Sequence, residues 1–262
     1  MQVSASAENA KTDAFDRRLF GLSASYDIIH DPHFSYGYGV SGAFSSEQDA
    51  FTRIAFATGR RDVQTASGFA SANWDFSDNL LNPKTGWRAE LYAQPTYSFG
   101  DASALYLKAL GEVRAYRTVS PDRGLVAAGR LRLGSVFGAK VSDIPTDQRF
   151  YAGGGGSVRG FAYQEVGPQA GDGTYTGGRS LIEAVAEMRW QQSARLGWAV
   201  FVDAGAVSEN DFPKADNLRV GAGVGARYMT PAGPLRFDIA TPLDRRDGES
   251  PVQVYISLGQ AF

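Results

Sequence analysis

One arginine and two carboxylates are the residues whose types and spacing best suit a buried charge cluster. Arg159 stands between apolar residues in the segment 153–161 (GGGGSVRGF), and Glu187 and Asp203 fall on the polar face of two consecutive predicted strands. A guanidinium shared by two carboxylates is strongly held and has a fixed orientation. Because an unpaired buried charge is costly, an arginine inside the fold needs such partners. The alternative is that all three are ordinary charges on a solvated polar face.

Two glycine-rich segments accompany these charges. The run 153–156 lets the backbone adopt positive φ and approach other segments closely, so we interpret it as the flexible approach to Arg159 rather than as a floppy linker. It is not a phosphate-binding loop, because no Lys-Ser/Thr pair follows it. Gly221, Gly223 and Gly225 share one face of a predicted strand with no helix after it, which excludes a dinucleotide fingerprint. They favour a thin wall against which another segment lies.

Other kinds of active site find little support. His30 and His33 flank one predicted turn without an obvious third ligand, so we expect neither a metal site nor a Ser/His/Asp triad. The chain has no cysteine, which removes disulfides, thiol catalysis and cysteine-based zinc sites. A formal net charge of −2 argues against nucleic acid as the main partner. We therefore expect no enzymatic activity, no metal and no cofactor.

Alternation of apolar and polar residues predicts an all-β protein. The clearest segment is 218–228, and the same pattern appears in 87–99, 105–116, 181–190 and 198–207. A soluble sandwich and a transmembrane barrel both show such alternation. Predicted strands of about ten to fourteen residues suit a tilted strand that crosses a bilayer better than a sandwich strand of about five or six. Aromatic residues at the strand ends resemble an interfacial girdle, so we predict an antiparallel transmembrane β-barrel surrounded by outer-membrane lipid.

Turn signals divide the chain into about twelve predicted strands within one barrel domain, residues 1–262. The predicted strands are 15–28, 33–44, 49–58, 63–76, 87–99, 103–118, 124–138, 179–191, 197–208, 217–229, 233–241 and 252–262. Residues 4–12 are interpreted as a frayed end or the remnant of another strand. The turns 121–124, 192–195 and 231–233 are short, whereas the loops 139–178, 209–216 and 242–251 are long, as in outer-membrane barrels. Arg159 then lies in the longest loop, on the extracellular side or folded into the lumen.

The last predicted strand presents an apolar face and ends on an aromatic residue. Val254, Ile256, Leu258 and Phe262 share this face. An ordinary edge strand that ends by chance on phenylalanine is the alternative interpretation.

Several segments resemble one family. Residues 150–161 (FYAGGGGSVRGF) resemble the loop-six signature of the BamA/TamA superfamily of outer-membrane assembly and translocation barrels. Residues 197–205 (GWAVFVDAG) are similar to the strand that receives the arginine of that loop, and 220–228 and 231–238 are similar to the next two strands. Residues 82–86 (NPKTG) resemble a periplasmic turn of the family. The resemblance extends from about residue 74 to the end of the chain, and TamA is the most similar member.

The resemblance implies a locked loop and a role in protein assembly. The motif residues would be Gly153, Gly154, Ser157, Val158, Arg159, Gly160 and Phe161. Arg159 would pair with Asp203 and Glu187, with Phe201 packed nearby. The implied role is the insertion or secretion of β-rich proteins, autotransporters in particular, at the cell outer membrane. Implied partners are unfolded β-barrel clients and a TamB-like periplasmic protein anchored in the inner membrane, and a terminal aromatic such as Phe262 is the family's assembly signal.

The sequence departs from the family pattern near its start. No POTRA domains and no signal peptide are visible, and we count twelve strands where the family has sixteen. Two forms are compatible with this count: the C-terminal part of a sixteen-stranded barrel, and a short barrel that closes residues 15–28 onto 252–262. The competing function is a twelve-stranded autotransporter translocator or a passive pore. A translocator should carry a helix that threads the pore before the first strand.

Overall fold

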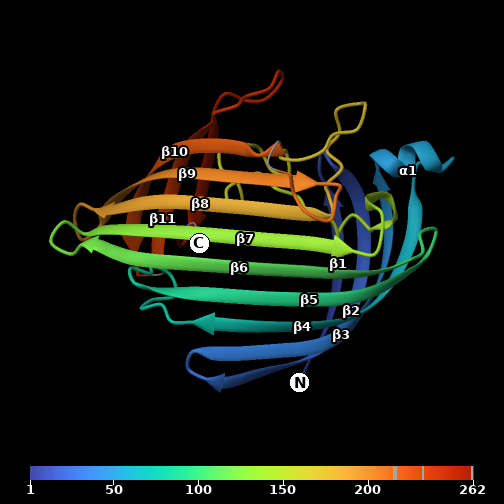
Figure 1. Cartoon of the computed structure of the whole chain (residues 1–262), viewed down its shortest axis with the longest axis horizontal. Helices are drawn as coiled ribbons and strands as arrows, with labels where there is room; N and C mark the ends of the chain where they lie inside the picture. The colour runs from blue at the N-terminus through green and yellow to red at the C-terminus, as the bar shows by residue number, and fades with distance from the viewer. Residues whose placement is uncertain (215–216, 232, 261) are drawn as a thin grey trace.

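Twelve antiparallel strands form one continuous sheet, in which each strand pairs with its neighbours in sequence. The computed structural model describes residues 1–214, 217–231, 233–260 and 262. Its strands are β1 (Gln2–Lys11), β2 (Phe15–Asp31), β3 (Phe34–Asp49), β4 (Arg61–Asp75), β5 (Gly86–Gly100), β6 (Ala104–Ser120), β7 (Leu125–Phe137), β8 (Ser180–Gln191), β9 (Leu196–Ser208), β10 (Arg219–Thr230), β11 (Gly233–Pro242) and β12 (Gln253–Leu258). Helix α1 (Ala50–Ala55) follows β3, and a short 3-10 turn spans Val141–Asp143. The sheet curls around a central space (Figure 1).

The all-β fold and the number of strands are confirmed, but one predicted strand is misplaced. The predicted strand 49–58 is absent, and α1 occupies most of this segment because Asp49 caps the helix: the backbone N–H of Thr52 donates to the Asp49 carboxylate at 2.8 Å. The Thr52 hydroxyl in turn accepts from the Asp49 N–H at 2.8 Å, which completes a reciprocal capping box. The number of strands is still twelve, because β1 is an additional strand at the start of the chain that pairs with β2 over its full length.

The two faces of the sheet differ as the alternation predicts. Large apolar side chains such as Val200 and Val224 are more than half exposed on the outside. Charged side chains of the opposite parity, including Glu187, Asp203 and Arg227, are almost completely buried on the inside. This is the arrangement of a barrel with a lipid-facing exterior and a polar interior. Among the described residues, no helix is long and apolar enough to cross a membrane.

The longest loops gather at one end of the strands, where the β1–β2 and β5–β6 connections are nevertheless short. The β2–β3, β6–β7 and β8–β9 connections are short, whereas residues 50–60, 138–179 and 243–252 form long connections at the opposite end. The β4–β5 connection, residues 76–85, departs from this pattern. It folds toward other strands, and the Pro83 carbonyl accepts from Arg189 at 3.4 Å. Positions 215–216 of the predicted loop 209–216 and position 232 of the turn 231–233 lie outside the described residues.

Two edges of the sheet lack a partner strand in the described part of the chain. β2 is paired on both sides, by β1 and β3, and β12 is paired with β11 from Leu235↔Leu258 to Ala240↔Gln253. The short barrel that joins residues 15–28 to 252–262 is therefore not the arrangement found. The outer sides of β1 and β12 carry no strand ladder among the described residues.

The prediction that the last strand runs to Phe262 is wrong. β12 ends at Leu258, and Gly259 adopts a φ of 89°, a conformation that favours glycine and breaks the strand. Val254, Ile256 and Leu258 face outward and are exposed, as predicted. Phe262 is 8% exposed and packs in a cluster with Tyr116, Ala128 and Val185.

Candidate functional site

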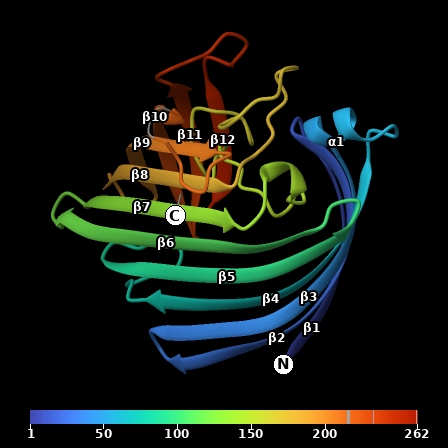
Figure 2. The ribbon, with the colours of Figure 1, turned by 45° about the vertical axis from the view of Figure 1, so that its right-hand side comes forward.

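The longest loop, residues 138–179, carries its own apolar core into the barrel. Val158 and Phe161 are buried in a cluster with Phe150, Val136 and other residues of the loop and wall. Figure 2 shows this loop, in yellow-green and yellow, between the half of the sheet that contains β8–β12 and the half that contains β1–β3. The apolar cluster holds the loop tip against the inner side of the wall.

Glycines shape the loop tip where other residues would be strained. Gly153, Gly154 and Gly160 have φ values of 105°, 101° and 103°, a region that L-residues rarely adopt. Between them, the hydroxyl of Ser157 accepts from the Gly153 N–H at 2.9 Å and donates to the carboxylate of Glu183. The glycine run is therefore an ordered turn, with Ser157 joining the turn to β8.

Arg159 lies at the centre of a buried charge cluster. Its Nε and Nη2 atoms donate to the two oxygens of Asp203 at 2.7 and 2.9 Å, and its backbone N–H donates to Asp203 Oδ2 at 3.0 Å. Its Nη1 atom donates to Glu187 at 2.8 Å. The guanidinium also lies 3.3 Å from the centroid of the Phe201 ring. The structure thus brings together all four residues that the sequence singles out for this contact.

The cluster contains further members that sequence reasoning missed. Asp238 on β11 accepts from Arg159 Nη1 at 3.1 Å and from Arg227 on β10 at 2.5 Å. Arg189 donates to Glu187 at 2.7 Å, and Arg236 lies 3.3 Å from Asp238. The sequence does contain a signal for two of them: Arg236 and Asp238 alternate with apolar residues on the predicted strand 233–241, which places both on its polar face. Four arginines therefore share three carboxylates inside the barrel.

The electrostatic environment keeps Arg159 charged. Burial by itself disfavours the charged guanidinium, but the hydrogen bond and negative charge of Asp203, followed by the charge of Glu187, raise the pKa of Arg159 above its ordinary value. The pairing is bidentate toward Asp203, which fixes the orientation of the side chain as well as its charge. The loop tip is consequently held by ionic hydrogen bonds to three different strands, β8, β9 and β11.

The wall that contacts the loop tip has no side chains at the three glycines of β10. A Cβ atom on Gly221 would overlap the carbonyl oxygen of Arg159, and one on Gly223 would lie 2.5 Å from the Phe201 ring. A Cβ atom on Gly225 would overlap the carboxylate of Asp238. Gly221 thus makes room for the loop tip, as the sequence predicts, whereas Gly223 and Gly225 make room for side chains and backbone of neighbouring strands.

The last strand also contacts the loop tip. Tyr255 on β12 accepts from the Gly160 N–H at 3.0 Å and donates to the Phe161 carbonyl at 2.7 Å. A Cβ atom on Gly155 would lie 3.0 Å from the same tyrosine ring. The loop is therefore bonded to the strand whose outer edge is unpaired among the described residues.

Phe262 lies apart from the outward face that it was predicted to share. Its ring stacks on Tyr116 with centroids 6.4 Å apart, and the guanidinium groups of Arg130 and Arg189 lie 5.9 and 5.3 Å from its centroid. The ring therefore packs among inward-facing residues of β6, β7 and β8.

The two histidines occupy ordinary surface positions. The Nδ1 atom of His33 is 2.8 Å from the Asp75 carbonyl, and its ring stacks on Phe76. The His30 ring packs edge-on against Phe34. Within the described ranges, no three His, Cys, Asp or Glu side chains are grouped as metal ligands.

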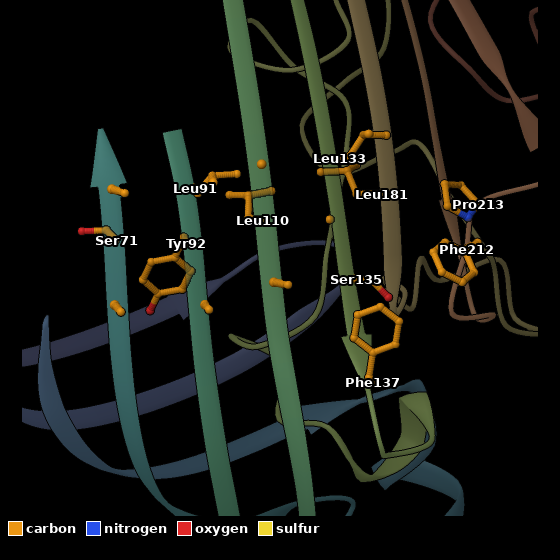
Figure 3. Close-up of a pocket in the computed structure, with 16 residues that line it drawn as sticks. Ser71, Leu91, Tyr92, Leu110, Leu133, Ser135, Phe137, Leu181, Phe212 and Pro213 are labelled. Carbon is orange, nitrogen blue, oxygen red and sulfur yellow. The ribbon is translucent and has the colours of Figure 1, made fainter. Parts of the chain in front are cut away.

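An apolar groove of about 540 Å³ lies on the outer wall. Small outward residues of β4–β6 form its floor, and Leu91, Leu133, Phe137, Phe212 and Pro213 are among its larger lining residues. Figure 3 shows Phe212 and Pro213 next to Phe137, and the two phenylalanine rings are 6.0 Å apart. None of its lining residues carries a charge, so the groove offers apolar contact rather than chemistry.

Replacing Arg159 with alanine tests the charge cluster. The substitution leaves the buried carboxylates of Asp203 and Glu187 without their central partner, and we expect a loss of about 3–5 kcal/mol in the free energy of unfolding. Urea unfolding in phospholipid vesicles, followed by heat-modifiable gel migration, measures this loss. Asp172→Ala removes an exposed carboxylate of the same loop and should leave the midpoint unchanged. Equal midpoints for Arg159→Ala and the parent would contradict the assignment.

Replacing Gly221 with alanine tests the close approach of loop and wall. The new methyl group has to displace the Arg159 backbone, and overpacking of this kind costs about 1–3 kcal/mol. The same urea titration measures the effect. Gly171→Ala is the matched control, because a Cβ atom there has no neighbour within 4 Å. A Gly221→Ala variant as stable as Gly171→Ala would show that the loop tip does not rest on β10.

Comparisons with known proteins agree with this architecture. A family model described as the Omp85 superfamily domain matches residues 2–262. The outer membrane protein assembly factor BamA of Nitratidesulfovibrio vulgaris is 34% identical over 164 residues, which are 60% of this chain and 20% of that protein. BamA of Neisseria meningitidis serogroup B is 22% identical over 220 residues, which are 71% of this chain and 27% of that protein. The chain thus spans between a fifth and a third of the length of the curated relatives it matches.

Solved structures share the fold. The crystal structure of BamA from Haemophilus ducreyi lacking POTRA domains 1–3 superimposes with a TM-score of 0.77 at 20% identity, covering 95% of this chain and 56% of that one. CdiB from Escherichia coli gives a TM-score of 0.60 at 13% identity, covering 92% of this chain and 45% of that one. These relatives bear the names BamA and CdiB, so the specific likeness to TamA stays a prediction. The chain belongs to the Omp85 superfamily, and it is an outer-membrane β-barrel rather than an enzyme.

Proposed function

We propose that this chain is the barrel of a factor that helps insert or secrete β-rich proteins at the outer membrane. The observation that carries the proposal is β12, a strand of six residues whose outer edge has no partner among the described residues. Residues 1–262 act in this proposal as a single barrel domain. Membership of the Omp85 superfamily and the likeness to assembly factors named BamA support the same role.

An unpaired strand edge has a specific consequence in lipid. Backbone N–H and C=O groups without partners are costly in the hydrocarbon region, because no water is available to bond them. The edge of β12 therefore binds another strand readily, and the backbone of an incoming client strand satisfies it by β-augmentation. Val254, Ile256 and Leu258 already face outward, so a strand added there continues the lipid-facing surface.

The loop keeps this edge in position from the inside. Tyr255 of β12 is hydrogen-bonded to the loop tip. Arg159 of the tip is in turn paired with carboxylates of β8, β9 and β11. In our proposal the motif residues 153–161 thus act through β12: they orient the strand that templates the client. This role requires binding and positioning, and no bond is broken.

The finer assignment follows the motif resemblance. We propose a TamA-like factor whose clients include autotransporters and whose periplasmic partner is a TamB-like protein. In this proposal Val254, Ile256, Leu258 and Phe262 serve the chain's own assembly as its recognition signal. Phe262 would be recognised before its ring enters the cluster with Tyr116.

A passive pore is the less favoured function. The loop 138–179 lies within the barrel and carries the charge cluster, which leaves less room for a wide channel. An autotransporter-type translocator would carry a pore-threading helix, and α1 is the one α-helix in the part of the chain that the structure describes. α1 has six residues and directly follows β3, so it does not precede the first strand.

Site-specific cross-linking tests the templating edge. The natural chain has no cysteine, so single cysteines can be introduced at Val254 and Ile256 on β12 and paired with cysteines on the last strand of an unfolded client. We expect disulfides in one fixed register, because strand addition pairs specific residues. Val200→Cys on β9 is the matched control, since it is equally exposed to lipid but lies on a strand paired on both sides.

Two results would contradict the proposal. Cross-links of equal yield at Val200 and Val254 would show non-specific contact with the membrane-bound client. An absence of cross-links at β12, together with a large and steady single-channel conductance, would favour the passive pore.

A further inference from the structure

A second buried charge cluster holds the beginning of the long loop to the opposite wall. Arg149 lies 2.6 Å from Asp49, the last residue of β3, and both side chains are almost completely buried. Arg149 also donates to the carbonyls of Ile144 at 2.9 Å and Thr176 at 3.0 Å. One guanidinium therefore joins β3 to both the early and the late part of the loop.

A neighbouring pair strengthens this contact. Glu47 of β3 is fully buried and accepts from Arg61 of β4 at 2.7 Å. Its other oxygen accepts from the backbone N–H and the hydroxyl of Thr146 at 2.9 and 2.8 Å. Arg61 in turn donates to the carbonyl of Ile144 at 2.9 Å and to that of Ser142. One ion pair, Arg149–Asp49, and four hydrogen bonds from the Glu47–Arg61 pair thus fix the loop to β3 and β4.

The two clusters lie on different walls although they are close in sequence. Arg149 and Arg159 are ten residues apart, but Arg149 binds β3 whereas Arg159 binds β8, β9 and β11. Strands β5, β6 and β7 separate these walls along the sheet. The strand ladders found in the described residues join only neighbours in sequence, so the loop is the connection across the interior.

We infer that the loop is a two-point strut and that Arg149 is a positioning residue for the β3–β4 wall. Strand twist curves the sheet but does not by itself fix the distance between two edges that are unpaired among the described residues. With the loop bound at Arg149 and at Arg159, the distance between the walls is fixed, and with it the separation of the β1 and β12 edges. The inference concerns the shape of the barrel and holds whether or not β12 templates client strands.

A distance measurement between the two edges tests the strut. Ala7→Cys on β1 and Val254→Cys on β12 place nitroxide labels at exposed positions of an otherwise cysteine-free chain. Double electron–electron resonance on the purified chain in lipid nanodiscs then gives the distance distribution. We expect Arg149→Gln to broaden the distribution and to shift its mean by more than the width of the parent distribution. A second label pair, Val200→Cys and Ile239→Cys on β9 and β11, should be unchanged in the same variant.

The matched control is an arginine that joins the same loop to the helix that follows β3. Arg53 of α1 pairs with Asp172 of the loop at 3.0 Å, but both side chains are largely exposed, so Arg53→Gln should leave the β1–β12 distribution unchanged. Asp49→Asn serves as the second variant if Arg149→Gln does not fold, because asparagine can still cap α1. A folded Arg149→Gln or Asp49→Asn variant with the parent distribution would overturn the inference. So would an equal shift in the Val200–Ile239 pair, which would indicate general loosening.

Discussion

The need of a buried guanidinium for negative partners governs the interior of this barrel. Arg159 cannot enter the lumen alone, because an uncompensated charge there is costly. Asp203, Glu187 and Asp238 supply the partners from three strands, so one side chain of the loop is bound to three strands of the wall at once. Gly221 of β10 follows from the same constraint, since the arginine reaches its partners only if its own backbone lies against the wall.

The exterior and the interior place opposite demands on each strand. Outward positions such as Val200 and Val224 are apolar because they face lipid, while the alternate positions carry the charges that hold the loop. The β1 and β12 edges have no ladder among the described residues, so the loop has a second task beyond filling the lumen. The loop binds β3 near one edge and binds β12 through Tyr255 at the other, so it connects the two edges across the interior.

The sequence was informative where a local pattern decides the structure. Alternation in residues 218–228 predicted which side chains face inward, and the placement of Arg159 among glycines pointed to a folded loop tip. Asp238 was missed because its contact with Arg159 depends on the register of three neighbouring strands. The alternation predicts a strand at residues 49–58, but the capping contact of Asp49 favours a helix there. The position of Phe262 was missed because the cluster that contains it is built from residues of β6, β7 and β8. Contacts between distant segments were thus the part that the pattern did not contain.

The pairing of Arg159 with Asp203 holds the loop tip to the wall, and a double-mutant cycle tests this pairing most directly. The free energies of unfolding of the parent, Arg159→Ala, Asp203→Ala and the double variant give the coupling energy between the two side chains. We expect a favourable coupling near the upper end of the range of about 0.5–3 kcal/mol observed for contacting residues. A coupling energy of zero within error would contradict it, because the loop would then be held by contacts that do not involve this ion pair.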